Sequence, residues 1–138
     1  MEISQDEVAL YDRQIRLWGL EAQSRMRDAH VLLVGMRGLA CEVAKSLVLA
    51  GIGQLTLLEH ESVRAEDLRA HFFIKEEDVG TNRALASLPR LQQLNPRVGI
   101  HVNCDTIATI DASYFADFDV TIVTNQPYPI LVSFPYLF

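Results

Sequence analysis

The sequence has only two cysteines, Cys41 and Cys104, and neither belongs to a C-x-x-C or C-x-x-H pair. Structural zinc sites use such spacings, so nothing here supports bound zinc. The histidines are equally scattered, and no two stand at metal-ligand spacing: His30, His60, His71 and His101. We therefore expect no metal site, histidines that serve packing or the surface, and two buried free thiols in a reducing compartment.

Positive charge and long apolar runs are also scarce. The chain carries 12 lysines and arginines against 18 acidic residues, and its net charge is −6. No basic cluster offsets this balance, which argues against nucleic acid as a main partner. The apolar runs have only strand length and the N-terminus is acidic, which argues against a membrane span and a signal peptide. The chain has 138 residues, of which 49% are apolar, and this is enough to build the hydrophobic core of one folded domain.

Residues 5–28 have the pattern of an amphipathic helix. Apolar side chains recur three or four positions apart, at Val8, Tyr11, Ile15, Trp18 and Ala22. Ser4 and Glu7 resemble a capping box at the start of this helix. Gly19 predicts a bend between two helical pieces.

A strand–helix–strand unit follows. Residues 31–34 read as a buried strand, 39–50 as a helix and 54–58 as a second strand. The helix has three apolar positions on one face, Val43, Leu47 and Ala50, and Gly51 is expected to end it. Such a crossover is right-handed, and its two strands are parallel.

The second half of the chain continues this alternation. After an irregular, polar segment over 60–80, the pattern predicts a helix over 81–94 with Leu85, Leu88 and Leu91 facing inward. Pro89 predicts either a kink or a helix that begins late. Further elements are expected as strands at 98–103 and 119–124 and a short helix or turn at 111–116.

These elements predict an α/β fold with a Rossmann-like, doubly wound, mostly parallel sheet. An N-terminal helical segment, residues 1–28, precedes the domain over residues 29–125. Residues 126–138 form a divergent tail with no usable periodicity.

The turn Gly35-Met-Arg-Gly38-Leu-Ala40 joins the first predicted strand to its helix. Glycine-rich turns at this place bring the backbone close to a phosphate. Arg37 stands where that motif has its second glycine, so a strand–helix turn without a ligand is an equal alternative.

Two further candidates involve charge. Glu59 closes the second strand, where an acidic residue can bind ribose hydroxyls; the alternative is a solvated carboxylate beside Glu61. Arg13 and Arg16 lie in the first helix and either form a solvated, ion-paired face or serve phosphate recognition.

The run Tyr11-Asp-Arg-Gln-Ile-Arg-Leu-Trp-Gly19 resembles the opening of enzymes that activate ubiquitin-like proteins. Residues 31–60 and 78–96 are similar to the same family, with Val79-Gly80, Arg83-Ala84 and Asn95-Pro96 in order. The resemblance extends over residues 7–125 and is strongest to the small subunits of SUMO-activating enzymes. It identifies residues 29–125 as a partial adenylation domain of the ThiF type.

The resemblance implies a heterodimer. Its large catalytic subunit would bind ATP and magnesium, adenylate the C-terminal glycine of SUMO and then take SUMO as a thioester. The small subunit would meet SUMO only indirectly and contribute one arginine, by position Arg13, to the ATP phosphates of the large subunit. The resemblance also implies a nuclear, and additionally cytoplasmic, location.

The sequence departs from the active members of this family at the nucleotide site. Their asparagine–arginine pattern is replaced by Glu66-Asp-Leu-Arg69, and their lysine is replaced by Arg83. At about the position of their magnesium-binding aspartate, this chain has Val123 instead. We therefore expect a degenerate nucleotide pocket, without a metal, that consists of Gly35, Gly38, Glu59 and Arg83.

Because the family domain continues beyond the fourth strand, we expect the fold to be truncated, that is, incomplete in its C-terminal half. Two other functions stay open. One is an autonomous adenylyltransferase of the cofactor-biosynthesis type, which needs a magnesium aspartate and usually zinc-binding cysteines. The other is a non-catalytic docking fragment.

Overall fold

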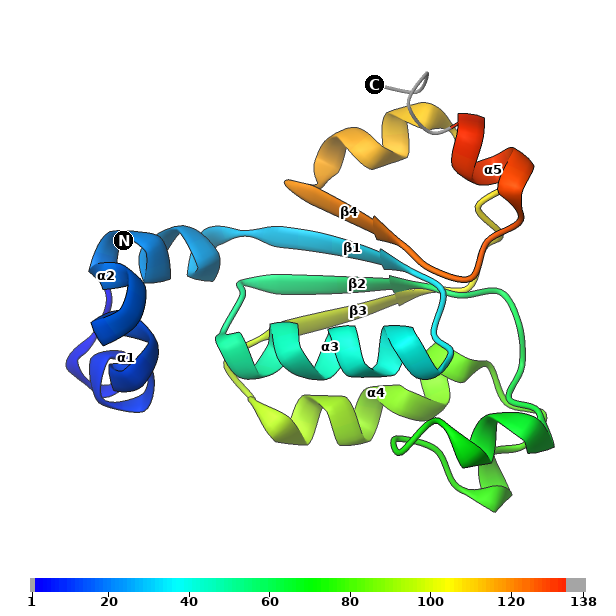
Figure 1. Ribbon diagram of the computed structural model, residues 1–138, viewed down its shortest axis with the longest axis horizontal. Coiled ribbons are helices and arrows are strands. Elements are labelled where there is room, and N and C mark those ends of the chain that lie inside the picture. Colours follow the sequence, from blue (N-terminus) through cyan, green and yellow to red (C-terminus); the bar gives the residue numbers. More distant parts are fainter. Residues whose placement is uncertain (1, 134–138) are drawn as a thin grey trace.

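The structure is a computed structural model that describes residues 2–133 (Figure 1). Its helices and strands are α1 (Gln5–Leu10), α2 (Asp12–Asp28), β1 (His30–Val34), α3 (Gly38–Ala50), β2 (Gln54–Leu58), α4 (Arg83–Leu94), β3 (Gly99–Asn103), β4 (Val120–Val123) and α5 (Tyr128–Ser133). Three short 3₁₀ helices are η1 (Ala65–Arg69), η2 (Glu76–Asp78) and η3 (Ala112–Asp117). None of the described helices is long and apolar enough to cross a membrane.

The four strands form one parallel sheet in the order β3-β2-β1-β4. The chain first moves outward from β1 to β2 and β3, and then returns to the other side of β1 as β4. This reversal is the switch point at which doubly wound sheets bind ligands. The predicted α/β, Rossmann-like architecture is confirmed.

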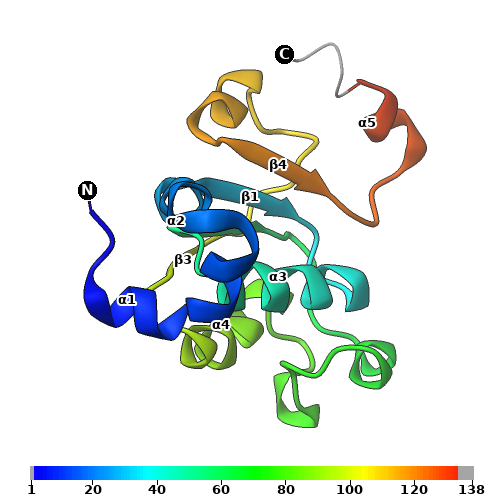
Figure 2. The same cartoon turned by 60° about the vertical axis from the view of Figure 1, so that its left-hand side comes forward.

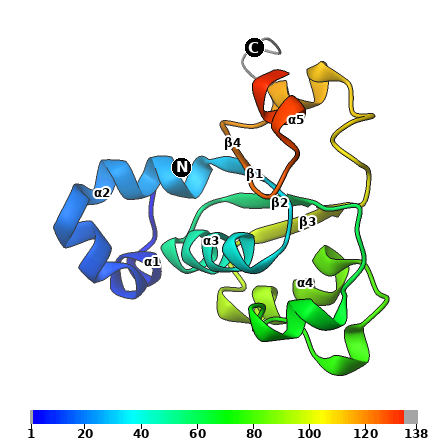
Figure 3. The ribbon, with the colours of Figure 1, turned by 45° about the vertical axis from the view of Figure 1, so that its right-hand side comes forward.

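Alternation along the strands produces two apolar layers. On β1, Val31 and Leu33 pack into the main core with α3 and α4, whereas Leu32 and Val34 face a smaller cluster with Ile107. Figures 1 and 3 show α3 and α4 on one side of the sheet and α5 near β4 on the other. Within residues 2–133 the β4 strand pairs only with β1, so it is an edge strand.

Helix α3 buries a stripe of small residues rather than the predicted apolar face. Its fully buried side chains are Ala40, Cys41, Ala44 and Val48, whereas Val43 and Leu47 are only partly buried. Small residues allow a helix to approach a sheet closely, and periodicity alone does not distinguish this stripe from its larger neighbours. The expectation of two buried thiols is half wrong, because Cys41 is buried but Cys104 is exposed.

Helix α4 differs from its prediction in a similar way. It begins at Arg83, where Asn82 caps it by accepting hydrogen bonds from two backbone N–H groups. Pro89 lies inside the helix rather than in its first turn. Leu91 is buried as predicted, but Leu85 is 47% exposed because Arg83 and other residues occupy the inner face.

The N-terminal segment consists of two helices that break at Tyr11, and α2 bends again at Gly19, whose φ of 88° is not helical. The predicted capping box is present, since Ser4 and Glu7 exchange hydrogen bonds. Trp18, predicted on the buried stripe, is 40% exposed. Figure 2 shows the two helices at the end of the sheet where the strands begin.

Polar contacts anchor this segment. The hydroxyl of buried Tyr11 accepts a hydrogen bond from Asn95 Nδ2 at 2.7 Å. Gln23, also buried, donates to the carbonyl of Ala50 at 3.1 Å and accepts from Trp18 Nε1 at 3.1 Å. The helices are thereby held against the ends of α3 and α4 that precede β2 and β3.

The tail contains helix α5, which the sequence did not predict. Its Ile130 packs against the smaller apolar cluster. Two prolines, Pro127 and Pro129, lie at the start of this helix, where proline is tolerated. The rest of the predicted tail, residues 134–138, lies outside the described residues.

Gly35 and Gly80 provide a matched test of how closely β1 and β4 approach. Both have positive φ, 90° and 91°, so alanine at either should cost about 1–2 kcal/mol in backbone strain. A Cβ at Gly35 would also lie 2.7 Å from the carbonyl oxygen of Thr124, whereas one at Gly80 would meet nothing within 4 Å. Gly35→Ala should therefore lose at least about 1 kcal/mol more than Gly80→Ala in urea denaturation. Equal losses would contradict the close approach.

Candidate functional site

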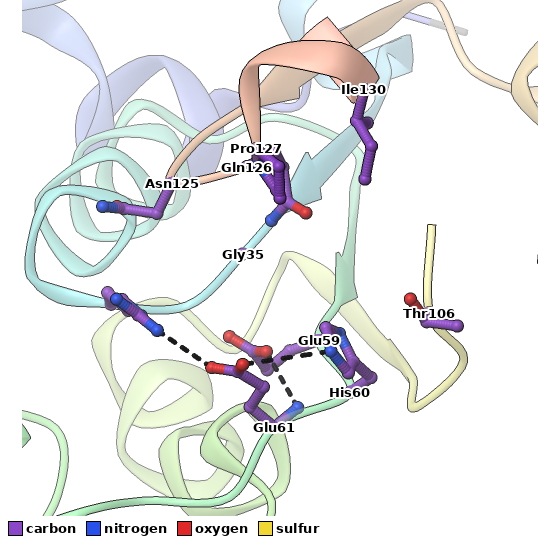
Figure 4. A pocket seen from close by; sticks show the side chains of 10 residues that line it. Gly35, Glu59, His60, Glu61, Thr106, Asn125, Gln126, Pro127 and Ile130 are labelled. Atoms are coloured by element: carbon purple, nitrogen blue, oxygen red, sulfur yellow. Dashed lines mark hydrogen bonds and ion pairs between the residues drawn. The ribbon is translucent and has the colours of Figure 1, made fainter. Parts of the chain in front are cut away.

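A cavity of about 310 Å³ lies at the carboxyl ends of the strands, at the switch point between β1 and β4 (Figure 4). The turn after β1, the loops after β2 and β3, and the segment after β4 form its walls. Its lining residues are Gly35, Arg37, Glu59, His60, Glu61, Thr106, Asn125, Gln126, Pro127 and Ile130. This is the position at which doubly wound sheets bind ligands.

Glu59 is buried and fully engaged with the backbone. Its Oε2 accepts from Met36 N at 2.8 Å, and its Oε1 accepts from Glu61 N at 3.0 Å. It is only 5% exposed, so the alternative of a solvated surface carboxylate is wrong. The carboxylate holds the glycine turn after β1 against the loop after β2.

Arg83 is the largest fully buried side chain, with 1% of its surface exposed. Its Nη1 lies 2.8 Å from Glu61 Oε2 and 3.7 Å from Glu59 Oε2, and its Nε lies 2.8 Å from Asp67 Oδ2. A buried guanidinium requires such partners, because an unpaired charge inside a protein is very costly. Arg83 is therefore a structural ion beneath the cavity and does not line it.

Glu61 links this buried ion to the cavity wall. Its Oε2 also accepts from Arg37 Nη2 at 3.0 Å, and its Oε1 lies 3.7 Å from Arg64 Nη2. Hydrogen bonds from Arg83 and then Arg37 lower the pKa of Glu61 from 4.5 to about 2. Burial raises the pKa of Asp67, but the backbone N–H of Arg64 and the Arg83 guanidinium outweigh it, so the net shift is downward.

His71 lies beside this cluster and is 2% exposed. Its Nδ1 accepts from the backbone N–H of Phe73 at 3.3 Å, and its Nε2 is 3.4 Å from the Ser87 hydroxyl. Burial lowers the pKa of His71. It is a neutral packing residue, as the sequence predicted for the histidines.

The predicted pocket residues are brought together only in part. Gly35 and Glu59 line the cavity, and Arg83 lies behind it. Gly38 faces elsewhere, because a Cβ there would lie 3.1 Å from the Cβ of Ala70, so this glycine permits packing against η1. Sequence reasoning missed the ion pair of Arg37 with Glu61, since two residues so far apart in the chain give no local pattern.

Other departures from the active pattern are equally visible. Arg69 is exposed and does not line the cavity, and Val123 packs into the smaller apolar cluster. Within residues 2–133, no group of three or more histidine, cysteine or carboxylate side chains could hold a metal ion.

Arg13 lies at the opposite end of the sheet. It is an exposed residue of α2, which lies at the end of the sheet where the strands begin (Figure 1), whereas the cavity lies where the strands end. Its neighbour Arg16 pairs with Asp12 at 2.9 Å, but Arg13 has no ion pair within the described part of the chain. Arg13 therefore cannot reach the cavity of its own chain.

The cavity has the position of a nucleotide site but not its charge. Three carboxylates, Glu59, Glu61 and Asp67, balance the guanidiniums of Arg37, Arg64 and Arg83. A triphosphate needs spare positive charge or a metal, and the described residues offer neither. The residues present do not fit a magnesium–ATP complex.

A parallel, doubly wound sheet with a glycine turn and a cavity at its switch point defines the class of Rossmann-like, nucleotide-binding-type domains. The model of the ThiF family matches residues 11–125, and the chain belongs to this family.

Its relatives include proteins named SUMO-activating enzyme subunit 1. The chain is 54% identical to the one from Xenopus laevis over 130 residues, which are 94% of this chain and 38% of the relative. It is 53% identical to the one from Homo sapiens over 122 residues, 88% of this chain and 35% of the relative. The chain thus spans little more than a third of the length of these relatives.

Solved structures show the same fold. The tRNA N6-threonylcarbamoyladenosine dehydratase TcdA of E. coli superposes with a TM-score of 0.85 at 22% identity, over 99% of this chain and 59% of that chain. TcdA has also been solved in complex with ATP and with AMP. PaaA superposes with a TM-score of 0.76 at 25% identity, over 88% of this chain and 41% of its own.

Removal of the buried guanidinium should be costly. Arg83→Ala leaves Glu61 and Asp67 without their main cation, and breaking a buried ion pair typically costs about 3–5 kcal/mol. The control is Arg25→Ala. The ion pair of Arg25 with Glu21 is exposed, with side chains 78% and 82% accessible, so its loss should lower the unfolding free energy by less than about 1 kcal/mol. Urea denaturation of both variants measures the difference, and similar small losses would contradict the structural role of Arg83.

The ion pairs of Glu61 should make the unfolding free energy of the protein depend on pH at acidic values. Its pKa is lower in the folded protein than its ordinary 4.5, so its contribution is complete above that value and is lost as pH falls toward about 2. Glu61→Gln should therefore flatten the fall in unfolding free energy across this window, whereas exposed Glu66→Gln should not. The check is urea denaturation at a series of pH values, and parallel curves for wild type and Glu61→Gln would refute the assignment.

Proposed function

We propose that this chain is the non-thioester subunit of a heterodimeric SUMO-activating enzyme. In this role it supports ATP-dependent adenylation of the SUMO C-terminus, which the large catalytic subunit carries out. The names of the relatives that share over half of their aligned residues with it support this role. ATP and magnesium are bound mainly by the large subunit, and SUMO is met indirectly.

The observation that carries the proposal is the position of Arg13. It is an exposed, unpaired guanidinium in the described part of the chain, on helices anchored at the far end of the sheet from the chain's own cavity. Such a cation can serve a phosphate site only on another subunit. There it would offset the charge of the triphosphate as pyrophosphate leaves.

The surface around Arg13 supports a docked partner. Four large apolar side chains of α1 and α2 are 40–78% exposed: Leu10, Leu17, Trp18 and Leu20. Large apolar side chains that stay exposed are candidates for a protein interface, where aromatic and arginine residues are enriched. Burial of this surface would bring Arg13 close to the partner.

The alternative of an autonomous adenylyltransferase has less support, because the cavity has no spare positive charge for a triphosphate. The alternative of a docking fragment shares the apolar surface but gives Arg13 no role in the reaction. A nuclear, and additionally cytoplasmic, location would follow from the proposed partner.

Substitution of the two arginines distinguishes these functions. The chain and its variants are purified with the large subunit, and SUMO-dependent ATP–pyrophosphate exchange is measured. Arg13→Ala should slow exchange by about 10²- to 10³-fold, as loss of a transition-state charge contact typically does. Arg16→Ala is the matched control, because Arg16 is paired with Asp12, and it should retain near-normal exchange.

Gel filtration with the large subunit shows whether the heterodimer survives each substitution. Retained exchange in Arg13→Ala together with loss of exchange in Arg16→Ala would show that Arg16, and not Arg13, serves the ATP phosphates. Normal exchange in both variants with an intact heterodimer would favour the docking fragment. Exchange by the chain without the large subunit would refute the non-catalytic assignment.

A further inference from the structure

The cavity at the carboxyl end of the sheet already contains an anion, the side chain of Glu61. We propose that the Glu61 carboxylate occupies the anion-binding position of this cavity and so excludes phosphate groups from it. Glu61 would then determine the specificity of the cavity, and its removal would create an anion site. The proposal concerns the chain's own cavity and does not depend on any partner.

The arrangement around Glu61 is that of a bound anion. Its Oε2 lies 2.8 Å from Arg83 Nη1 and 3.0 Å from Arg37 Nη2. Its Oε1 lies 3.7 Å from Arg64 Nη2 and 4.0 Å from His60 Nε2. Guanidiniums that converge on one group are the arrangement that proteins use to bind phosphate.

The side chains around Glu61 come from three parts of the fold. Arg37 belongs to the glycine turn after β1, His60 and Arg64 to the loop after β2, and Arg83 to the start of α4. Figure 4 shows Glu61 and His60 together at the wall of the cavity, below Gly35. The carboxylate therefore lies beside the turn that approaches phosphate in this class of domain.

Two of the guanidiniums depend on Glu61 alone. Within residues 2–133, Arg37 and Arg64 form no other ion pair, whereas Arg83 also has Asp67 at 2.8 Å. Without the Glu61 charge, Arg37 would line the cavity unpaired, and Arg64 beside it would lose its ion pair. The cluster would change from electrical balance to an excess of one positive charge.

The exclusion is permanent under ordinary conditions. Because the arginines lower the pKa of Glu61 to about 2, this carboxylate stays charged throughout the physiological pH range. Its side chain is 30% exposed, so it is held by its ion pairs rather than sealed under other residues. Substitution, rather than a change of pH, is therefore the way to remove it.

The test measures binding of inorganic pyrophosphate by isothermal titration calorimetry, with ATP as a second probe. Wild type should show no detectable binding. Glu61→Gln, which keeps the size of the side chain, should bind pyrophosphate at least roughly tenfold more tightly, since charge-assisted hydrogen bonds contribute at least that much. Glu61→Gln combined with Arg37→Ala should lose most of this gain.

Glu66→Gln is the matched control. It removes the same charge from an exposed position of η1 that forms no ion pair within the described residues, so it should bind no better than wild type. Circular dichroism and thermal unfolding confirm that each variant is folded. If Glu61→Gln does not fold, Glu61→Ala serves instead, because it also removes the carboxylate and should show a gain in the same direction.

Three results would overturn the proposal. The first is binding of pyrophosphate by wild type as tightly as by the Glu61 variants. The second is a folded Glu61→Gln, or a folded Glu61→Ala where that variant is used, with no gain. The third is an equal gain in Glu66→Gln, which would show that net charge alone controls binding.

Discussion

The buried guanidinium of Arg83 constrains the whole carboxyl end of the molecule. A charge with 1% exposure persists only if its partners stay in place, so Glu61 and Asp67 must remain within hydrogen-bond distance. The two carboxylates come from the loop after β2 and from η1, whereas Arg83 begins α4. One ion cluster thus ties the loop after β2, and the η1 helix that follows it, to the start of α4 further along the chain. The apolar contacts of this region are few, a small cluster around Val63, Ile74 and Ala86, so the ion cluster supplies much of its order.

The same constraint determines what the cavity can do. Stability here requires that the carboxylates balance the arginines, whereas phosphate binding requires arginines that are free. In this chain the carboxylates balance the arginines, so no arginine of the cluster is left free to bind phosphate. At the amino end of the sheet the situation is reversed, since Arg13 is exposed and unpaired among the described residues. In a parallel sheet all strands point the same way, so these two ends are fixed on opposite sides of the domain.

The sequence predicted the parts of this structure that depend on local pattern. Strands β1 and β2, the helix between them and its end at Gly51 all follow from apolar runs and glycine positions. Patterns that depend on tertiary packing were predicted less well. Helix α3 buries Ala44 rather than Leu47, and α4 exposes Leu85, because contact with the sheet favours small side chains and the buried Arg83 occupies the inner face.

The candidate site was predictable in position but not in electrostatics. Gly35 and Glu59 stand at the ends of adjacent strands, so topology alone places them at one edge of the sheet. The partners of Arg37 and Arg83 come from the loop after β2 and η1, and a single sequence does not show which carboxylate a loop will bring to an arginine. Helix α5 was missed because residues 126–138 show no usable periodicity; its prolines lie at the start of the helix, where they are tolerated.

The way the N-terminal helices are attached bears on how they can act. They are held by few apolar contacts and by buried polar ones, such as Tyr11 with Asn95 and Gln23 with the carbonyl of Ala50. Hydrogen bonds are directional, so these contacts fix the orientation of α2 rather than only its proximity to the sheet. A side chain that must meet a phosphate on another subunit needs this kind of fixed support, because small displacements of a charged group greatly weaken its effect on a reaction. The polar anchor therefore holds the helix that carries Arg13 in a defined position and leaves apolar side chains of α1 and α2 exposed, as the proposed role would require.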